Sequence, residues 1–357
     1  MILTILLALQ IQSRATYDSV PQLIFVKESE IRGPEVQRPW QGVIWGSRLA
    51  ITPDDGPDFG MVLLFDLKTG SYLGRLGRDG SGPGEFRMVR VIRALASGEL
   101  FLVDVSNARV SWWTPGQPQP RKEERIVGGY WFDAVPWLGD TLLFTAERLP
   151  EIAAGYPLHL SVNARMVASF GTDRPHLEVR NWTESVRRLS SPSQGCWWAI
   201  PFDRQYLIQC FDSHRRPVRQ IERQPSWFKG WPLHQAQNQE ERDGGCRAKK
   251  YSQSWALEAD ETGRVWVAFL TPSKDYAVRA PCARSPIGRL GDYMDMPLEV
   301  FDGRSGRLLA SSTLKVGVIS ISTDGRIVTY DEDANDEPVI TVWRARVPND
   351  RARGVPQ

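Results

Sequence analysis

Apolar and polar residues alternate over short runs along most of this chain, and turn residues separate the runs. The clearest stretch is 73–113, where strand-like segments at 89–95, 100–103 and 109–113 are divided by a Ser-Gly turn and by a polar turn at 104–107. Runs of this length and alternation predict β-strands, and the connections are too short to hold helices. The stretch therefore predicts a meander of antiparallel strands.

A turn that usually contains glycine precedes an alternating strand six times in the sequence. The six copies span residues 46–51, 98–103, 139–144, 195–200, 263–268 and 325–330. A second marker follows the next strand, as LFDLKTG at 64–70 and VFDGRSG at 300–306, with a shorter Phe-Asp copy at 211–212. Repeats about 40 to 70 residues apart are typical of units of four strands joined by loops of unequal length.

Six such units predict an all-β fold, a six-bladed β-propeller of four-stranded antiparallel blades within residues 20–347, followed by a flexible tail at 348–357. The predicted blades lie near 39–77, 86–128, 129–171, 184–224, 252–314 and 316–347. The last unit shows only three strands, whereas the apolar segment 22–31 has no partner. Because an open ring leaves strand edges exposed, we expect 23–28 to add the outer strand to the last blade. A free N-terminal arm, with the apolar residues 23–26 exposed, is the alternative.

The glycine-rich turn at 80–84 and the strands after it contain the most specific sequence motif in the chain. The turn is followed by Glu85-Phe86, and Asp104, Asn107 and Arg109-Val110 follow the next strand. This motif resembles the NHL type of propeller repeat over about one blade. The C-terminal third resembles the same class of propeller, in the segments GDYMDMPLEVFDGRSGRLLA and DGRIVTYDEDANDEPVITVWRA. The resemblance implies a bacterial, exported, mostly uncharacterised six-bladed propeller. Its function remains open, because propellers include binding scaffolds, lyases and lactonases.

Composition and the N-terminus bear on location. Hydrophobic residues make up 41% and charged residues 24%, with a formal net charge of +2, so no electrostatic argument favours nucleic acid or an anionic membrane as partner. An apolar run of about nine residues opens the chain and is too short to span a bilayer. We interpret 1–15 as a signal peptide, although a basic segment before it is missing; a buried first strand is the alternative. A periplasmic or secreted monomer without a membrane span is expected.

The four cysteines fit this location. Cys196 and Cys210 lie symmetrically about a turn near residue 203, so an antiparallel hairpin would place them directly opposite each other and allow a disulfide. Cys246 and Cys282 fall in the two long connections around blade five. Four cysteines allow three pairings, and this topology favours 196–210 with 246–282. Disulfides imply an oxidising compartment; four reduced, buried thiols in the cytosol are the alternative.

Loop lengths distinguish the two faces of the predicted ring. With strands named A to D from the axis outward, A–B and C–D turns lie on one face, and B–C loops and D–A crossings lie on the other. The long connections at 53–60, 147–157, 172–184, 225–251 and 271–297 all belong to the second class. Long loops on a rigid scaffold commonly carry binding sites. We therefore expect binding on this second face, called the long-loop face below.

Two of these connections, 225–251 and 271–297, combine aromatic and basic side chains around blade five. Such surfaces are over-represented where partners bind, and they favour an acidic or carbohydrate-bearing partner. Packing of the rings onto the blade is the alternative. The expected binding residues are Trp227, Phe228, Trp231, Arg247, Tyr251, Tyr276, Arg279 and Tyr293.

Catalytic motifs are not found in the sequence. It lacks a G-x-S-x-G elbow, a P-loop and a dinucleotide fingerprint, and its four histidines lack zinc-binding spacing. The glycine-rich turn is interpreted as a blade connection, and the acidic loop tips at 54–58 and 332–337 as solvated turns. The sequence thus predicts a non-enzymatic exported scaffold that binds a protein, peptide or glycan, without a cofactor. A calcium-dependent hydrolase or lyase is the alternative, which gains if acidic or amide side chains converge at the central channel.

Overall fold

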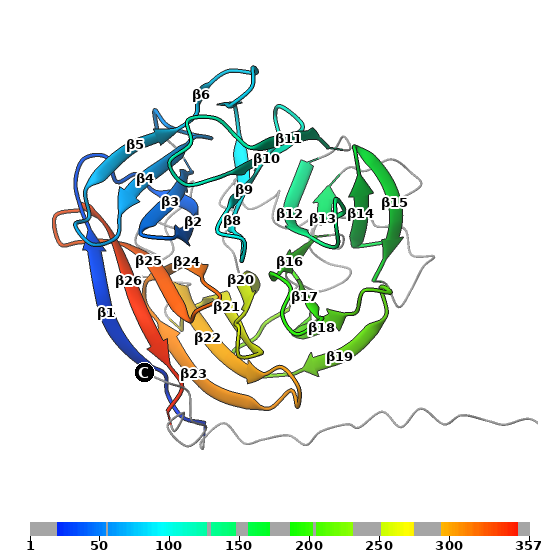
Figure 1. Ribbon diagram of the computed structural model, residues 1–357. Coiled ribbons are helices and arrows are strands. Elements are labelled where there is room, and N and C mark those ends of the chain that lie inside the picture. The colour runs from blue at the N-terminus through cyan, green and yellow to red at the C-terminus, as the bar shows by residue number, and fades with distance from the viewer. Residues whose placement is uncertain are drawn as a thin grey trace, which may run out of the picture.

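A computed structural model describes residues 20–54, 56–126, 130–147, 156–171, 186–202, 205–230, 251–274 and 294–348. Within these ranges every regular element is a β-strand. Six four-stranded sheets, each antiparallel, stand around one axis (Figure 1). The predicted six-bladed propeller is confirmed. In the described part of the chain, no helix that could cross a membrane is present.

The first three blades place their strands in chain order from the axis outward. Blade one contains β2 (Pro39–Trp45), β3 (Arg48–Pro53), β4 (Val62–Asp66) and β5 (Tyr72–Leu76). Blade two contains β8 (Val89–Ala94), β9 (Leu100–Asp104), β10 (Arg109–Trp113) and β11 (Lys122–Arg125). Blade three contains β12 (Tyr130–Pro136), β13 (Leu142–Glu147), β14 (Leu158–Val162) and β15 (Arg165–Phe170). Between blades one and two, β6 (Arg78–Asp79) and β7 (Glu85–Phe86) form a short parallel pair, so the glycine-rich turn at 80–84 is a blade connection.

The next two blades repeat this order, and the last one closes the ring. Blade four contains β16 (Arg187–Leu189), β17 (Trp197–Pro201), β18 (Leu207–Phe211) and β19 (Pro217–Glu222). Blade five contains β20 (Gln253–Ala259), β21 (Arg264–Pro272), β22 (Met294–Asp302) and β23 (Leu308–Leu314). Blade six contains β24 (Gly317–Ile321), β25 (Arg326–Glu332) and β26 (Pro338–Arg346), with β1 (Ile24–Ile31) outside β26.

The six repeated glycines start the B strands, and their backbone conformation explains the repeat. All six have positive φ, between 57° and 82°, which glycine adopts without the penalty that a Cβ brings. The second marker forms the C–D turn. Asp66 accepts hydrogen bonds from the backbone N–H groups of Lys68 and Thr69 at 3.0 and 2.8 Å, and Asp302 accepts from Arg304 and Ser305 in the same way. Local chemistry therefore sets the hairpins of the blades.

Ring closure follows the prediction, because β1 adds the outer strand to the last blade. Strand β1 pairs antiparallel with β26 from Ile24 opposite Arg346 to Ile31 opposite Ile340, with a bulge after Lys27. Leu23 is buried, yet the side chains of Ile24 and Val26 stay 53% and 45% exposed. Pairing satisfies the edge N–H and C=O groups of β26, but an outermost strand still presents alternate side chains to solvent. The predicted outer strand of the last blade is therefore confirmed, with Ile24 and Val26 on its exposed face.

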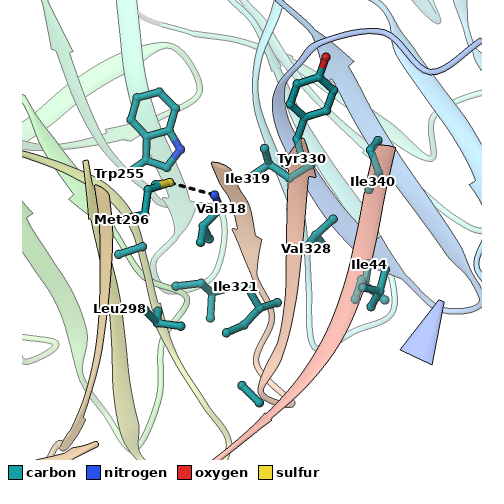
Figure 2. Packing of buried hydrophobic residues seen from close by; sticks show 14 of the residues in the cluster. Ile44, Trp255, Met296, Leu298, Val318, Ile319, Ile321, Val328, Tyr330 and Ile340 are labelled. Carbon is teal, nitrogen blue, oxygen red and sulfur yellow. Dashed lines mark hydrogen bonds between the residues drawn. The ribbon is translucent and has the colours of Figure 1, made fainter. Parts of the chain in front are cut away.

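The hydrophobic core lies between neighbouring blades. The largest cluster joins blades five, six and one, and Figure 2 shows Met296 and Leu298 of blade five beside Val318 and Ile321 of blade six. The Sδ atom of Met296 accepts a hydrogen bond from the backbone N–H of Val318 at 3.0 Å. Because apolar packing between blades fixes the A strands around the axis, their inward side chains are held in defined positions.

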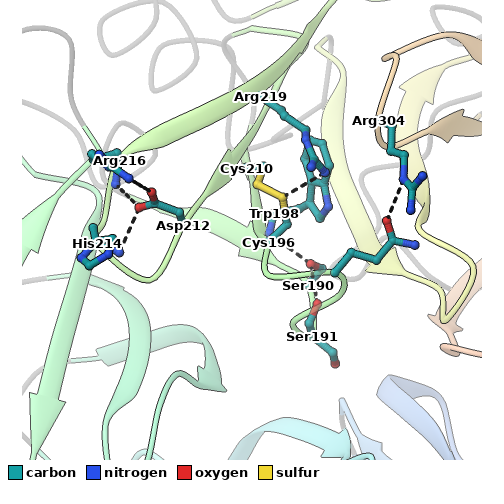
Figure 3. Close-up of a disulfide and its surroundings, with 11 residues drawn as sticks. Ser190, Ser191, Cys196, Trp198, Cys210, Asp212, His214, Arg216, Arg219 and Arg304 are labelled. Carbon is teal, nitrogen blue, oxygen red and sulfur yellow. Dashed lines mark hydrogen bonds and ion pairs between the residues drawn. A yellow bond between two sulfur atoms is a disulfide. The ribbon is translucent and has the colours of Figure 1, made fainter.

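A disulfide joins Cys196 and Cys210 in blade four, with a Cα–Cα distance of 5.4 Å (Figure 3). The predicted bond is present, but its expected register is wrong. Cys210 lies opposite Trp198, so Cys196 is a diagonal neighbour two residues along the strand. The two cysteines still share a face because side chains alternate with a period of two. Cys246 and Cys282 lie outside the described residues, and their pairing stays a prediction.

Candidate functional site

Ionisable side chains from four different A strands meet at the axis of the ring. They are Arg93 of β8, Asp133 of β12, Arg188 of β16 and Glu258 of β20, and a cavity of about 60 Å³ lies among them. That volume holds only a few water molecules. The A strands line the axis of a propeller. These four groups therefore lie at the central channel, where the sequence analysis considered a site formed by acidic or amide side chains.

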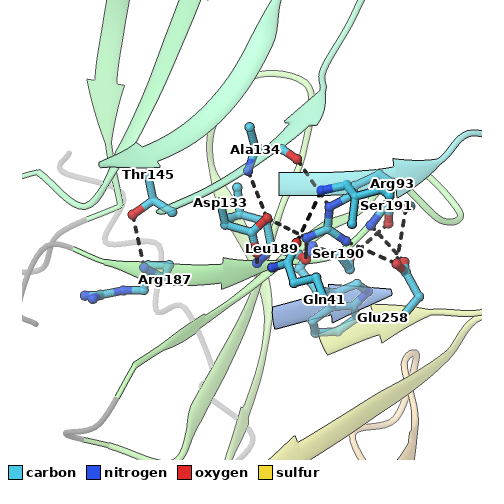
Figure 4. A network of polar contacts seen from close by, with 12 residues as sticks. Gln41, Arg93, Asp133, Ala134, Thr145, Arg187, Leu189, Ser190, Ser191 and Glu258 are labelled. Carbon is cyan, nitrogen blue, oxygen red and sulfur yellow. Dashed lines mark hydrogen bonds and ion pairs between the residues drawn. The ribbon is translucent and has the colours of Figure 1, made fainter. Parts of the chain in front are cut away.

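Arg93 binds to neighbours on three other blades, as Figure 4 shows. Its Nη2 lies 2.7 Å from Oδ1 of Asp133 and also donates to the carbonyl of Leu189 at 2.7 Å. Its Nε donates to the carbonyl of Ala134 at 3.2 Å, and its Nη1 lies 3.3 Å from Oε2 of Glu258. Charge-assisted hydrogen bonds of this kind are strong and directional. We call Arg93, Asp133 and Glu258 the axial plug.

Glu258 is 6% exposed and accepts further hydrogen bonds besides the one from Arg93. The backbone N–H groups of Ser191 and Ala259 donate to its Oε1 at 2.8 and 3.0 Å, and the Ser191 hydroxyl donates to Oε2 at 3.3 Å. Burial raises the pKa of Glu258 to about 7, although Arg93 and the two N–H groups favour the ionised form. Near neutral pH this carboxyl is therefore partly protonated.

The axial carboxylates do not fit a calcium site as they stand. Oδ1 and Oδ2 of Asp133 accept from Arg93 and from the backbone N–H groups of Ala134 and Leu189. Both oxygens of Glu258 also face N–H or O–H donors, whereas calcium needs six to eight oxygen ligands turned toward it. A cation here would have to displace the guanidinium. Among the described residues, no cluster of three or more potential metal ligands occurs.

The acidic loop tips have basic partners as well. Asp58 is 7% exposed and forms an ion pair with Arg75. At the other tip, Asp333 binds Arg32 at 2.7 Å. Hydrogen bonds from the backbone N–H groups of its own turn, together with Arg32, lower the pKa of Asp333. These carboxylates stabilise turns on the long-loop face.

Arg188 has a different environment, although it is only 5% exposed. Its Cζ lies 4.5 Å from the ring centroid of Phe132 and 5.9 Å from those of Phe202 and Trp255. Its Nε is buried without a hydrogen-bond partner in the described part of the chain. Burial lowers the pKa of Arg188 to about 10, with the charge of Asp133 opposing the shift. The guanidinium thus contacts rings but no acceptor among the described residues.

The rings around Arg188 continue toward blade one. Trp255 contacts Trp40 edge to face at 6.3 Å, and the guanidinium of Arg90 lies 4.9 Å from the Trp40 ring and 5.3 Å from that of Phe59. Arg90 also forms an ion pair with Asp54 at 3.8 Å. Aromatic rings and guanidinium groups therefore alternate, an arrangement stabilised by cation–π attraction. We call this set the arginine–aromatic layer, which comprises Phe59, Arg90, Trp40, Trp255, Arg188, Phe132 and Phe202.

Strand direction places the two groups at different depths. Each A strand starts at the D–A crossing, on the long-loop face, and ends at the A–B turn on the other face. Arg93 and Glu258 pair with the third residue after the glycine that precedes the B strand, whereas Arg188 pairs with the fifth. Asp133 pairs with the sixth. The arginine–aromatic layer therefore lies on the side of the long-loop face. Arg93 and Glu258 of the axial plug lie behind it, whereas the backbone of Asp133 lies at the depth of Arg188.

The predicted binding residues around blade five are only partly within the described residues. Trp227 and Phe228 are half-buried, and their rings contact Tyr206 at 6.0 and 5.7 Å and Phe269 at 5.3 and 5.5 Å. Tyr251 is half-buried too. Packing onto the blade thus holds for the first two rings, and their part in binding stays a prediction. Outside the described residues lie Trp231, Arg247, Tyr276, Arg279 and Tyr293.

The axial residues were missed by the sequence analysis, although a signal exists. Arg93, Asp133 and Glu258 each interrupt the apolar run of an inner strand, as in VRVIRALA, YWFDAVPW and SWALEA. A charge in the middle of a strand that should be buried calls for a partner. The sequence does not show that these charges meet, because they belong to different blades.

Comparisons with known proteins add the fold only. No protein-family model and no curated protein matches this chain. Among solved structures, it is similar to a member of the DUF4221 family from Bacteroides vulgatus, with a TM-score of 0.61 and 10% identity over 91% of this chain and 99% of the other. It is also similar to a Bacteroides fragilis protein described as exported, with a TM-score of 0.57 and 11% identity over 94% and 98%. The resemblance to NHL repeats stays a prediction.

Proposed function

We propose that this protein is an exported, non-enzymatic propeller scaffold that binds a protein, peptide or glycan partner on its long-loop face. The observation that carries the proposal is the arginine–aromatic layer at the axis on that side. Within it, Phe59 is 37% exposed and Trp40 is half-buried. Tryptophan and arginine are enriched among the residues that dominate binding energy at interfaces. Long connections from five positions in the fold start and end on the same face.

Export is supported by three independent features. The apolar N-terminal run resembles a signal peptide at 1–15. The disulfide between Cys196 and Cys210 belongs to an oxidising compartment. One of the two Bacteroides proteins of similar fold is described as exported. Together they favour a periplasmic or secreted location.

The calcium-dependent hydrolase or lyase remains the alternative, since Asp133 and Glu258 do converge at the axis. Both carboxylates are bound by Arg93, however, and a guanidinium in that position competes with a metal ion. The non-enzymatic scaffold is therefore the function that the site favours.

A capture experiment tests the proposal with the full-length mature protein and the extracytoplasmic fraction of its source cells. One variant changes the blade-five connections (Trp231→Ala, Arg247→Gln and Arg279→Gln), and a second changes the axial layer (Trp40→Ala and Arg90→Gln). A control carries Lys68→Gln, Arg216→Gln and Arg304→Gln, three exposed cations in C–D turns on the other face.

We expect the control to capture the same partner as the wild type, and at least one long-loop variant to lose it. Quantitative mass spectrometry after crosslinking measures the captured amount, and thermal melting checks that each variant is folded. Full capture by both long-loop variants, or loss by the control, would contradict the proposal.

A further inference from the structure

We infer that the axial cavity beside Arg188 binds a single carboxylate group. The inference rests on the proposed function, because it assigns the chemistry by which a partner contacts the long-loop face. It differs from that proposal in naming one side chain, one cavity and one ligand class.

The buried guanidinium of Arg188 has an N–H donor without an acceptor in the described chain. A guanidinium carries five N–H donors in a planar fork, and burying them without acceptors is strongly unfavourable. In the described chain, the side chain of Arg188 forms neither a hydrogen bond nor an ion pair, and its Nε is buried and unsatisfied. The rings of Phe132, Phe202 and Trp255 attract the positive charge but do not replace an oxygen acceptor. An acceptor from a ligand would complete this environment.

A small cavity lies next to the guanidinium of Arg188. Arg188 lines the cavity of about 60 Å³ together with Gln41, Trp255 and Ser320. That space is of the size of a few water molecules, so it admits a small planar group and excludes a sugar ring. Because Arg188 lies closer to the long-loop face than Arg93 and Glu258 do, the group would approach from that face. Arginine forks match carboxylates through two parallel hydrogen bonds.

Four ionisable side chains that line the cavity determine its net charge. Arg93 and Arg188 supply two positive charges, and Asp133 supplies one negative charge. Glu258 supplies a second negative charge only when ionised. Since burial raises its pKa to about 7, the four groups sum to between zero and +1 at neutral pH. A singly charged carboxylate balances this surplus, whereas a phosphate dianion exceeds it.

Protonation of Glu258 therefore links carboxylate affinity to pH. Glu258 binds Arg93 from β8, which in turn binds Asp133 from β12, and Glu258 lines the same cavity as Arg188 from β16. The cavity residues Gln41 of β2 and Ser320 of β24 carry no charge. As pH rises through about 7, the carboxyl becomes negative, the surplus disappears and affinity for an anion decreases.

Titration with sodium acetate, followed by ligand-observed NMR, tests the site in the full-length protein. We expect saturable binding to the wild type that weakens between about pH 6 and about pH 8. Arg188→Met should lose at least about ten-fold in affinity, and Arg188→Lys, which keeps the charge without the fork, should fall between them. Arg121→Gln is the control, because it removes an exposed cation bound to Glu99 away from the axis. Thermal melting verifies that the variants are folded.

Two further ligands distinguish the source of the carboxylate. A capped tetraglutamate peptide that competes with acetate, while its glutamine counterpart does not, identifies an acidic chain as the natural ligand. Acetate binding without competition by the peptide identifies a free small carboxylate. Tighter binding of inorganic phosphate, equal acetate affinity of Arg188→Met and wild type, or no acetate binding to the wild type overturns the inference. Those results leave the capture experiment unaffected, so the two proposals fail separately.

Discussion

Arg93 and Arg188 lie at the same axis, and they differ in how their charge is satisfied. The side chain of Arg93 is 14% exposed and has two carboxylates and two carbonyls as partners. The guanidinium of Arg188, a residue that is 5% exposed, packs against aromatic rings and has no hydrogen-bond acceptor among the described residues. A buried charge with a full set of partners supports the fold, whereas one without acceptors is retained for another reason. This difference indicates that Arg93, in the axial plug, has a structural role, whereas Arg188, in the arginine–aromatic layer, is available to a ligand.

The position of the two layers fits this division. Arg93 and Glu258 lie toward the A–B turns, where connections are short. Arg93 contacts residues of blades three, four and five from blade two. The arginine–aromatic layer lies toward the long-loop face and includes Phe59 from a B–C loop. A partner on that face would contact Arg188, which is incompletely satisfied, before Arg93. Arg93 has a full set of partners and holds the blades together behind Arg188.

The largest expected effect comes from Arg93→Met. Removing the guanidinium leaves Asp133 and Glu258 buried without their cation, and breaking a buried ion pair in this way typically costs about 3–5 kcal/mol. Urea unfolding at neutral pH measures the loss. Arg90→Met is the matched control on the same strand, since its ion pair with Asp54 is longer, at 3.8 Å, and we expect a smaller change. A loss of unfolding free energy below about 1 kcal/mol for Arg93→Met would contradict a structural role for the axial plug.

The next effect is a pH dependence from Glu258. Its pKa is raised from 4.5 to about 7 in the folded protein, so the folded state keeps the proton that the unfolded state releases at lower pH. This contribution to stability is complete below pH 4.5 and is lost as pH rises to about 7, which corresponds to about 3 kcal/mol. Urea unfolding across this range should show a decline that Glu258→Gln flattens. An unchanged slope in Glu258→Gln would assign the decline to other groups.

The blades could be predicted because their determinants are local. Gly98 and Gly263 supply the positive φ that starts a B strand, and Asp66 caps its own turn within three residues. Closure was predictable from one apolar segment without a partner. The predicted register of the Cys196–Cys210 hairpin was wrong because the sequence pattern does not reveal a one-residue shift in the centre of the turn.

The axial site could not be predicted from the same signals. Arg93 and Glu258 are 165 residues apart in sequence, and only the closed ring brings their strands together. The sequence pattern also treats Arg188 as an ordinary strand residue in VRRLS. Whether such an arginine meets a carboxylate or a set of rings depends on the packing of four blades, which local periodicity does not specify.

Arg188→Met should have a smaller effect, and in the opposite direction from Arg93→Met. Replacing an incompletely satisfied buried charge with an apolar side chain of similar length removes its desolvation penalty, and loss of the cation–π contacts offsets part of the gain. We expect a net increase in the free energy of unfolding of about 1 kcal/mol. Urea unfolding of the two methionine variants side by side measures the contrast. If Arg188→Met destabilises the protein as strongly as Arg93→Met, both arginines are structural and the comparison fails.

Calcium should have the smallest effect, with no change in the melting temperature of the wild type on adding millimolar calcium or EDTA. The reason is that Asp133 and Glu258 already bind Arg93, and a metal ion would have to replace a cation that forms four hydrogen bonds. Arg93→Met sharpens the test, because it frees both carboxylates. Calcium should therefore raise the melting temperature of this variant more than that of the wild type. A wild type that is stabilised by calcium and destabilised by EDTA would instead favour the metal-dependent hydrolase or lyase.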